Sequence, residues 1–168
     1  KIQTEPKLIP DNSKERSQSQ IIENWSDTTL ANSIKIVFLE EIMKNPALFS
    51  SLFPNEISNS IEKFFVNMPF SIGSQISGLV NQKVKESLRL NLDYLTTLVQ
   101  KENFLVGKEL TVADISVASH LSLLSFPNSS GESLKGKGCS IYINDPSLKD
   151  LFKWRDSIED KLFTTCHD

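Results

Sequence analysis

The stretch that decides the fold is Asn103-Phe-Leu-Val-Gly-Lys-Glu-Leu-Thr-Val-Ala-Asp-Ile-Ser-Val-Ala-Ser-His120, which contains an almost complete helix start. Thr111 stands at the N-cap position, and Asp114 follows at the third helical position. In a capping box, the N-cap hydroxyl accepts the backbone N–H of the third helical residue, whose side chain in turn accepts the N–H of the N-cap. The sequence therefore predicts a helix that begins directly after Thr111.

The residues around this box predict how the helix is packed. Leu110 before the cap and Ile115 after the box occupy the positions of a hydrophobic staple. From Val112 to Leu124 the sequence is apolar or small on nearly every side and contains no Lys or Arg. A helix that is apolar all round is typical of the inside of a protein, so we expect this helix to lie within a bundle.

The rest of the chain also has the pattern of helices. Asn12, with Glu15 three residues later, predicts the start of a long helix that runs to about Asn45, because apolar residues recur there at spacings of three and four. Further helices are predicted over residues 55–66 and 74–101, and from Asp145-Pro146 onward. Because no alternating strands are found, the expected fold class is an all-α helical bundle.

Length and composition limit the possible functions. The 168 residues are enough for one domain with a hydrophobic core. The net charge is −3 and basic residues are scattered, which argues against a nucleic-acid partner or a membrane surface. Residues 1–10 are polar with two prolines and are predicted to form an interdomain linker, and residues 11–168 to form the domain. Because the chain begins at Lys1 rather than Met, we expect it to be a fragment.

The cysteines and histidines suggest no reactive site. Cys139 and Cys166 give no disulfide framework, so we expect reduced thiols in a cytoplasmic protein. The terminal Cys166-His167-Asp168 has the residue types of a catalytic triad, but a chain end cannot hold such groups rigidly. His120 is expected to be a hydrogen-bonded residue inside the bundle, and no second ligand stands at metal spacing. The sequence therefore predicts neither a catalytic residue nor a metal site.

A long loop is expected over residues 126–144. It contains Gly131-Glu-Ser-Leu-Lys-Gly-Lys-Gly138, which nearly spells a phosphate-binding loop, but Gly138 replaces the required Ser or Thr. The loop also follows a helix and precedes a stretch predicted to be extended, Ser140–Ile143, so nucleotide binding is excluded. Two interpretations remain: a mobile surface loop, which loop length favours, or a flap over a cleft with Tyr142 and Lys137 as contact residues.

Together these segments resemble the C-terminal helical domain of the glutathione transferase family. Phe104-Leu-Val-Gly107 followed by Leu110-Thr-Val-Ala-Asp114 resembles the start of the central helix of that domain. Pro10-Asp-Asn-Ser13, with the helix after it, resembles the first long helix, and Leu151-Phe-Lys-Trp-Arg155 resembles the last. The resemblance covers residues 8 to 163, and its most specific part is the capping segment.

The resemblance implies a role in glutathione conjugation or peroxide reduction, with glutathione as co-substrate and a small electrophile as second substrate. In the family, the thiol-activating group belongs to an N-terminal thioredoxin-like domain, so this chain alone is expected to be inactive and to hold no cofactor. The resemblance places Ile34, Phe38 and Ile42 in the hydrophobic wall for the second substrate, although ordinary core packing would also explain each of them. A homodimer is compatible with it. The alternative is a non-catalytic module of the same fold that binds other proteins.

Overall fold

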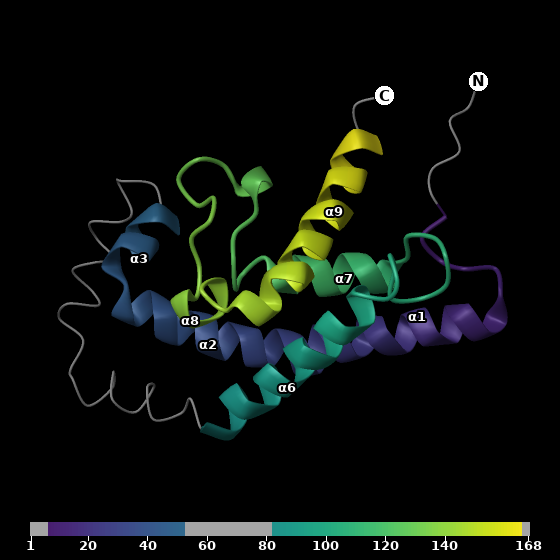
Figure 1. Ribbon diagram of the computed structural model, residues 1–168, viewed down its shortest axis with the longest axis horizontal. Coiled ribbons are helices and arrows are strands. Elements are labelled where there is room, and N and C mark those ends of the chain that lie inside the picture. Colours follow the sequence, from purple (N-terminus) through teal and green to yellow (C-terminus); the bar gives the residue numbers. More distant parts are fainter. Residues whose placement is uncertain (1–6, 53–81, 166–168) are drawn as a thin grey trace.

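The computed structural model describes residues 7–52 and 82–165, which form a bundle of helices (Figure 1). Its α-helices are α1 (Ser13–Trp25), α2 (Ala31–Lys44), α3 (Pro46–Leu52), α6 (Gln82–Val99), α7 (Val112–Leu121), α8 (Ser140–Ile143) and α9 (Lys149–Thr165). Within these described residues there is no strand, only an isolated bridge between Ser125 and Gly138. The predicted all-α class is confirmed.

The first half of the bundle is one long helical rod, as the sequence predicted. The side chain of Asn12 caps it by accepting the N–H groups of Lys14 and Glu15, at 2.9 and 3.2 Å. Between α1 and α2 the rod contains one π-helical turn, Ser26–Leu30, whose flanking residues keep helical dihedral angles. This turn, which the sequence did not reveal, offsets the faces of α1 and α2 relative to an uninterrupted α-helix.

Helix α7 lies at the centre of the bundle, against α1, the π-helical turn, α2 and α9 (Figure 1). Ala113, Val117 and Leu121 are fully buried on it, which confirms the prediction of an internal helix. Helix α6 packs between α2 and α9. Fully or almost fully buried residues of these neighbours complete the core: Ile34 and Val37 on α2, Leu88, Leu92 and Leu95 on α6, and Leu151, Trp154 and Ile158 on α9.

Two local predictions were wrong. The central helix ends at Leu121 and not at Leu124, because the chain turns there and the carbonyl of Leu124 accepts the N–H of Cys139 at 2.8 Å. Residues 140–143, expected to be extended, form the short helix α8. The carbonyl of Cys139 accepts the N–H groups of Tyr142 and Ile143, at 2.9 and 3.1 Å, which closes that helical turn.

The segment between α7 and α8 is attached to the bundle by backbone and side-chain hydrogen bonds. The N–H of Phe126 donates to the carbonyl of Lys137 at 2.7 Å, and the N–H of Gly136 donates to the carbonyl of Phe126 at 2.9 Å. The ammonium of Lys137 donates to the hydroxyl of Ser51 on α3 at 2.6 Å. These bonds fix both ends of the loop.

Some predictions concern residues outside the described part of the chain. The helix predicted over 55–66, the first part of the helix predicted over 74–101, and Cys166 all fall there. In the described ranges, no helix has the length and apolar character that crossing a membrane requires.

Candidate functional site

The start of α7 is organised by one carboxylate, that of Asp114, which is fully buried. Its Oδ2 accepts the backbone N–H and the side-chain hydroxyl of Thr111, both at 2.8 Å. Its Oδ1 accepts the backbone N–H of Leu105 at 2.7 Å. The carboxylate thus accepts the N–H of the N-cap residue, as it would in a capping box, and makes an additional bond to the turn before the helix. The bond to Leu105 was not foreseen, because the box pattern describes only the helix start.

These contacts explain Asp114 as a structural residue. Burial raises the pKa of its carboxyl group, while the hydrogen bonds from Leu105 and Thr111 act in the opposite direction. No part of the side chain is exposed, so a substrate cannot reach it. Leu110 packs against the edge of the core and Ile115 is partly buried. Their direct contact as a staple stays a prediction.

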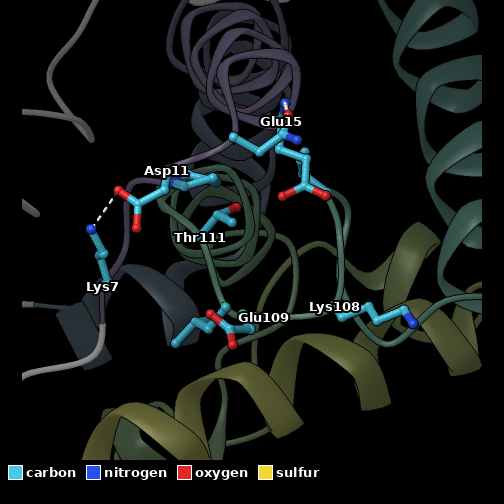
Figure 2. Close-up of a pocket in the computed structure, with 10 residues that line it drawn as sticks. Lys7, Asp11, Glu15, Lys108, Glu109 and Thr111 are labelled. Atoms are coloured by element: carbon cyan, nitrogen blue, oxygen red, sulfur yellow. Dashed lines mark hydrogen bonds and ion pairs between the residues drawn. The ribbon is translucent and has the colours of Figure 1, made fainter.

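A charged pocket of about 380 Å³ lies beside this helix start, between the N-terminal segment and the turn before α7. Figure 2 shows Asp11, Glu15 and Glu109 around Thr111, with Lys7 paired to Asp11. These side chains contain neither a thiol nor an imidazole.

The segment before α1 is bound to the bundle next to this pocket. The carbonyl of Leu8, within the predicted linker 1–10, accepts the N–H of Val112 at 3.1 Å. One of the N–H groups that a helix start leaves without an intrahelical partner is thereby satisfied. The bond between Leu8 and Val112 and the absence of reactive side chains in the pocket lining indicate a structural junction between the N-terminal segment and α7 rather than a reactive site.

A second polar cluster joins the π-helical turn to α7. The Oδ1 atom of Asp27 accepts the hydroxyl of Ser116 at 2.6 Å and lies 3.0 Å from Nε2 of His120. The bonds from Ser116 and then His120 lower the pKa of Asp27. The serine bonds to the carboxylate and not to the imidazole, so the three residues do not form a nucleophile–base–orienter chain. Sequence reasoning missed Asp27 because it lies far from His120 in the chain.

The three residues predicted to form a substrate wall differ in their exposure. Ile34 is fully buried in the core, whereas Phe38 and Ile42, further along α2, are only partly buried. The ring of Phe38 packs edge to face against Phe126, with 5.8 Å between centroids and an interplanar angle of 69°. The role of these residues in substrate binding stays a prediction.

The other chemistry-bearing residues are engaged or buried. Cys139 is fully buried, and burial, together with the carboxylates of Glu41 and Glu40, raises the pKa of its thiol to about 12. It is therefore a protonated thiol at neutral pH, unsuited to nucleophilic attack. Among the described residues, no group of three or more His, Cys, Asp or Glu side chains could hold a metal ion.

The sequence matches known proteins whose family has a helical domain, as the described structure does. The described residues form an all-helical bundle around a buried central helix, so the chain belongs to the class of all-α bundle domains. Residues 77–160 match the family model described as "Glutathione S-transferase, C-terminal domain", and the chain belongs to this family.

A curated relative is similar over much of the chain. It is FtsZ-localized protein A from Caulobacter vibrioides (strain NA1000 / CB15N), which is 26% identical over 124 residues. The match covers 74% of this chain and 44% of that protein. The chain thus spans less than half the length of that relative.

Proposed function

We propose that this chain is the helical half of a glutathione-dependent enzyme that conjugates small electrophiles or reduces peroxides, with the thiol-activating group in a thioredoxin-like partner domain. Family membership over residues 77–160 is the observation that carries the proposal. The buried, protonated state of Cys139 supports the division of labour, because this thiol can neither act as a nucleophile nor reach glutathione to stabilise its thiolate.

Within this proposal, the C-terminal part of α2 is the wall of the second-substrate site. Phe38 and Ile42 are the partly exposed members of the predicted set, and Ile34 supports them from the core. The edge-to-face contact with Phe126 holds the ring of Phe38 in one orientation. An aromatic electrophile would gain apolar and stacking contacts there.

Steady-state kinetics of the full-length protein test this assignment. In Phe38→Ala, we expect the KM for 1-chloro-2,4-dinitrobenzene to rise several-fold while the KM for glutathione stays constant. Leu39→Ala is the matched control, because Leu39 is the next residue on α2 and is 54% exposed. Equal KM values for the electrophile in both variants and the wild type would contradict the wall. Absence of any conjugation or peroxidase activity in the full-length protein would contradict the enzyme.

The isolated chain should show no glutathione conjugation above the buffer reaction. The reason is that the proposal assigns the thiol-activating group to the thioredoxin-like partner domain, and that Cys139, the described thiol, is buried. Turnover by the isolated chain would require a thiolate-stabilising site inside the bundle and would overturn the proposed division of labour.

A second candidate is a non-catalytic module that binds a protein partner, which the name of the relative FtsZ-localized protein A favours. The outer face of α6 supports it, because Leu90, Tyr94 and Leu98 follow each other at four-residue spacing and are 54%, 67% and 51% exposed. Exposed apolar stripes of this kind are typical of helix-mediated contacts.

Co-sedimentation with polymerised FtsZ tests this candidate. The full-length protein should sediment with the polymer, and Leu98→Ser should weaken that association at least tenfold. The control is Ile21→Ser, which removes an apolar side chain that is 67% exposed from α1. Sedimentation that is absent, or unaffected by Leu98→Ser, contradicts a module that acts through α6.

A further inference from the structure

The ring of Phe126 is a second aromatic surface beside the proposed substrate wall. It packs edge to face against Phe38 on α2, with 5.8 Å between the ring centroids and 69° between the ring planes. Both residues are only partly buried, so part of each remains accessible. The two inclined rings form a corner in which a flat aromatic group can stack on one ring and meet the other with its edge, the arrangements that aromatic groups prefer.

The position of Phe126 depends on the backbone of the loop that carries it. Its N–H donates to the carbonyl of Lys137 at 2.7 Å, and its carbonyl accepts the N–H of Gly136 at 2.9 Å. Beside them, the N–H of Cys139 donates to the carbonyl of Leu124 at 2.8 Å. Because both backbone polar groups of Phe126 are bonded to the returning part of the loop, its backbone can shift only together with that part.

The side chain of Lys137 attaches this returning part of the loop to α3. Its ammonium donates to the hydroxyl of Ser51 at 2.6 Å. Helix α3 follows α2 directly after Asn45, so it continues from the helix that carries Phe38. Lys137 therefore bonds to Phe126 through its carbonyl and to α3 through its ammonium. One residue thus connects the two segments that bring the aromatic rings together.

We propose that Lys137 is a positioning residue of the second-substrate site, which holds Phe126 against Phe38 and thereby makes the site selective for flat aromatic electrophiles over aliphatic ones. This inference rests on the proposed function, because it concerns the same wall. Lys137 acts through Phe126 and needs no contact with the substrate. Without its ammonium, Phe126 keeps its bond to the carbonyl of Lys137, but the loop is no longer attached to α3 and the orientation of the ring is less well defined.

Two isothiocyanates of similar size measure this selectivity in the full-length protein. Benzyl isothiocyanate carries a flat ring, and cyclohexylmethyl isothiocyanate carries a saturated ring on the same reactive group. In both, the thiolate sulfur of glutathione bonds to the central carbon, the electron pair of the C=N bond moves to nitrogen, and nitrogen takes up a proton, so nothing is released. Relative to the uncatalysed rates, we expect kcat/KM to be at least threefold higher for the benzyl compound.

Substitutions of Phe126 test its part in this ratio. Phe126→Leu should lower the ratio at least threefold and leave the KM for glutathione unchanged, since an aromatic pair is worth about a two- to tenfold change in affinity. Phe126→Tyr keeps a ring and should retain the ratio. Phe104→Leu is the matched control, because Phe104 is also partly buried but lies before α7, with its ring centroid 4.3 Å from the ammonium of Lys161. An unchanged ratio in Phe126→Leu, or an equal fall in Phe104→Leu, would overturn the selectivity.

Substitutions of Lys137 test the positioning role. Lys137→Met removes the ammonium and keeps the backbone carbonyl, and we expect the ratio to fall about two- to threefold, the effect of one exposed hydrogen bond. Lys137→Arg should retain the ratio. Lys135→Met is the control from the same loop, where the ammonium lies 3.9 Å from Glu132. When Phe126 is already Leu, Lys137→Met should lower the ratio no further.

The outcomes separate this inference from the proposed function. A ratio that Lys137→Met leaves unchanged, or that it lowers equally in the absence of the Phe126 ring, contradicts the positioning role alone. Conjugation of neither isothiocyanate by the wild-type protein contradicts the proposed enzyme and, with it, this inference.

Discussion

The carboxylate of Asp114 and the backbone N–H of Leu105 are joined by a 2.7 Å hydrogen bond that attaches the turn before α7 to the first turn of that helix. The same carboxylate accepts two bonds from Thr111. One buried side chain therefore satisfies polar groups on both sides of the helix start. Because α7 is the helix around which the bundle packs, its start affects the stability of the whole domain.

Replacing Asp114 with Ala should destabilise the fold by about 3 kcal/mol. The substitution leaves the buried N–H of Thr111 and the partly buried N–H of Leu105 without an acceptor, and each such loss costs about 1–3 kcal/mol, with overlap between them. Urea unfolding of the chain measures the change. Glu109→Ala is the control, because Glu109 is an exposed carboxylate near the same turn and should change stability little. An Asp114→Ala midpoint equal to that of the wild type would restore Asp114 as a candidate functional carboxylate.

Thr111→Ala should cost about 1–2 kcal/mol, which is the range for loss of an N-cap side chain. The double variant with Asp114→Ala should cost less than the sum of the two single changes, because both residues serve one hydrogen-bonded unit. A double-mutant cycle in urea gives the coupling energy. Strict additivity would mean that the two side chains act independently.

Gly138→Ala should prevent or severely weaken folding. At this position φ is +144°, and an added Cβ would lie 2.3 Å from the carbonyl oxygen of Leu124. Gly136 provides the matched comparison, because its φ is +71° but an added Cβ would meet nothing within 4 Å. Gly136→Ala should therefore cost only about 1–2 kcal/mol, the strain of a left-handed residue. Thermal unfolding of the two variants measures the difference, and similar melting temperatures would contradict the close approach at Gly138.

Acid unfolding should depend on Asp145. Hydrogen bonds from Ser147 and the guanidinium of Arg89 lower the pKa of this carboxyl from 3.8 to about 2. Because the folded-state pKa is depressed, the stabilisation is present above pH 4 and is lost as the pH falls from about 4 toward 2.

Asp145→Asn removes this pH-dependent contribution. We expect the variant to be less stable than the wild type at pH 6, by about 1 kcal/mol for a partly exposed pair, and the gap to close near pH 2. Urea unfolding across this range measures it. Glu132→Gln, at a carboxylate that is 95% exposed, is the control. A gap that stays constant with pH would show that Asp145 contributes only packing.

Local sequence patterns predict much of the fold. The caps at Asn12 and Thr111 and the apolar spacing of α6 depend on residues three or four apart, so the sequence predicts them directly. The π-helical turn and the helix at Ser140–Ile143 were missed, because neither has a distinctive pattern of its own. The early end of α7 was missed for a different reason, since it follows from the pairing of Leu124 with Cys139 across the loop.

The candidate site was less predictable than the fold. Ile34, Phe38 and Ile42 share a helical spacing, but only the packing of the bundle leaves Phe38 and Ile42 partly exposed and buries Ile34. Tyr142 was considered as a contact residue in a loop, but the structure places it in the short helix α8, where it is only 4% exposed. Such properties depend on which distant segments meet.

The sequence by itself therefore determined the fold class, the start of each capped helix and the identity of the internal helix, because helix formation and capping act over one or two turns. The tertiary structure alone decided the partners that are distant in sequence: Asp27 with His120, Lys137 with Ser51, and Arg89 with Asp145. These depend on how helices pack against each other, and the residues involved carry no local signal of where their partners lie in space.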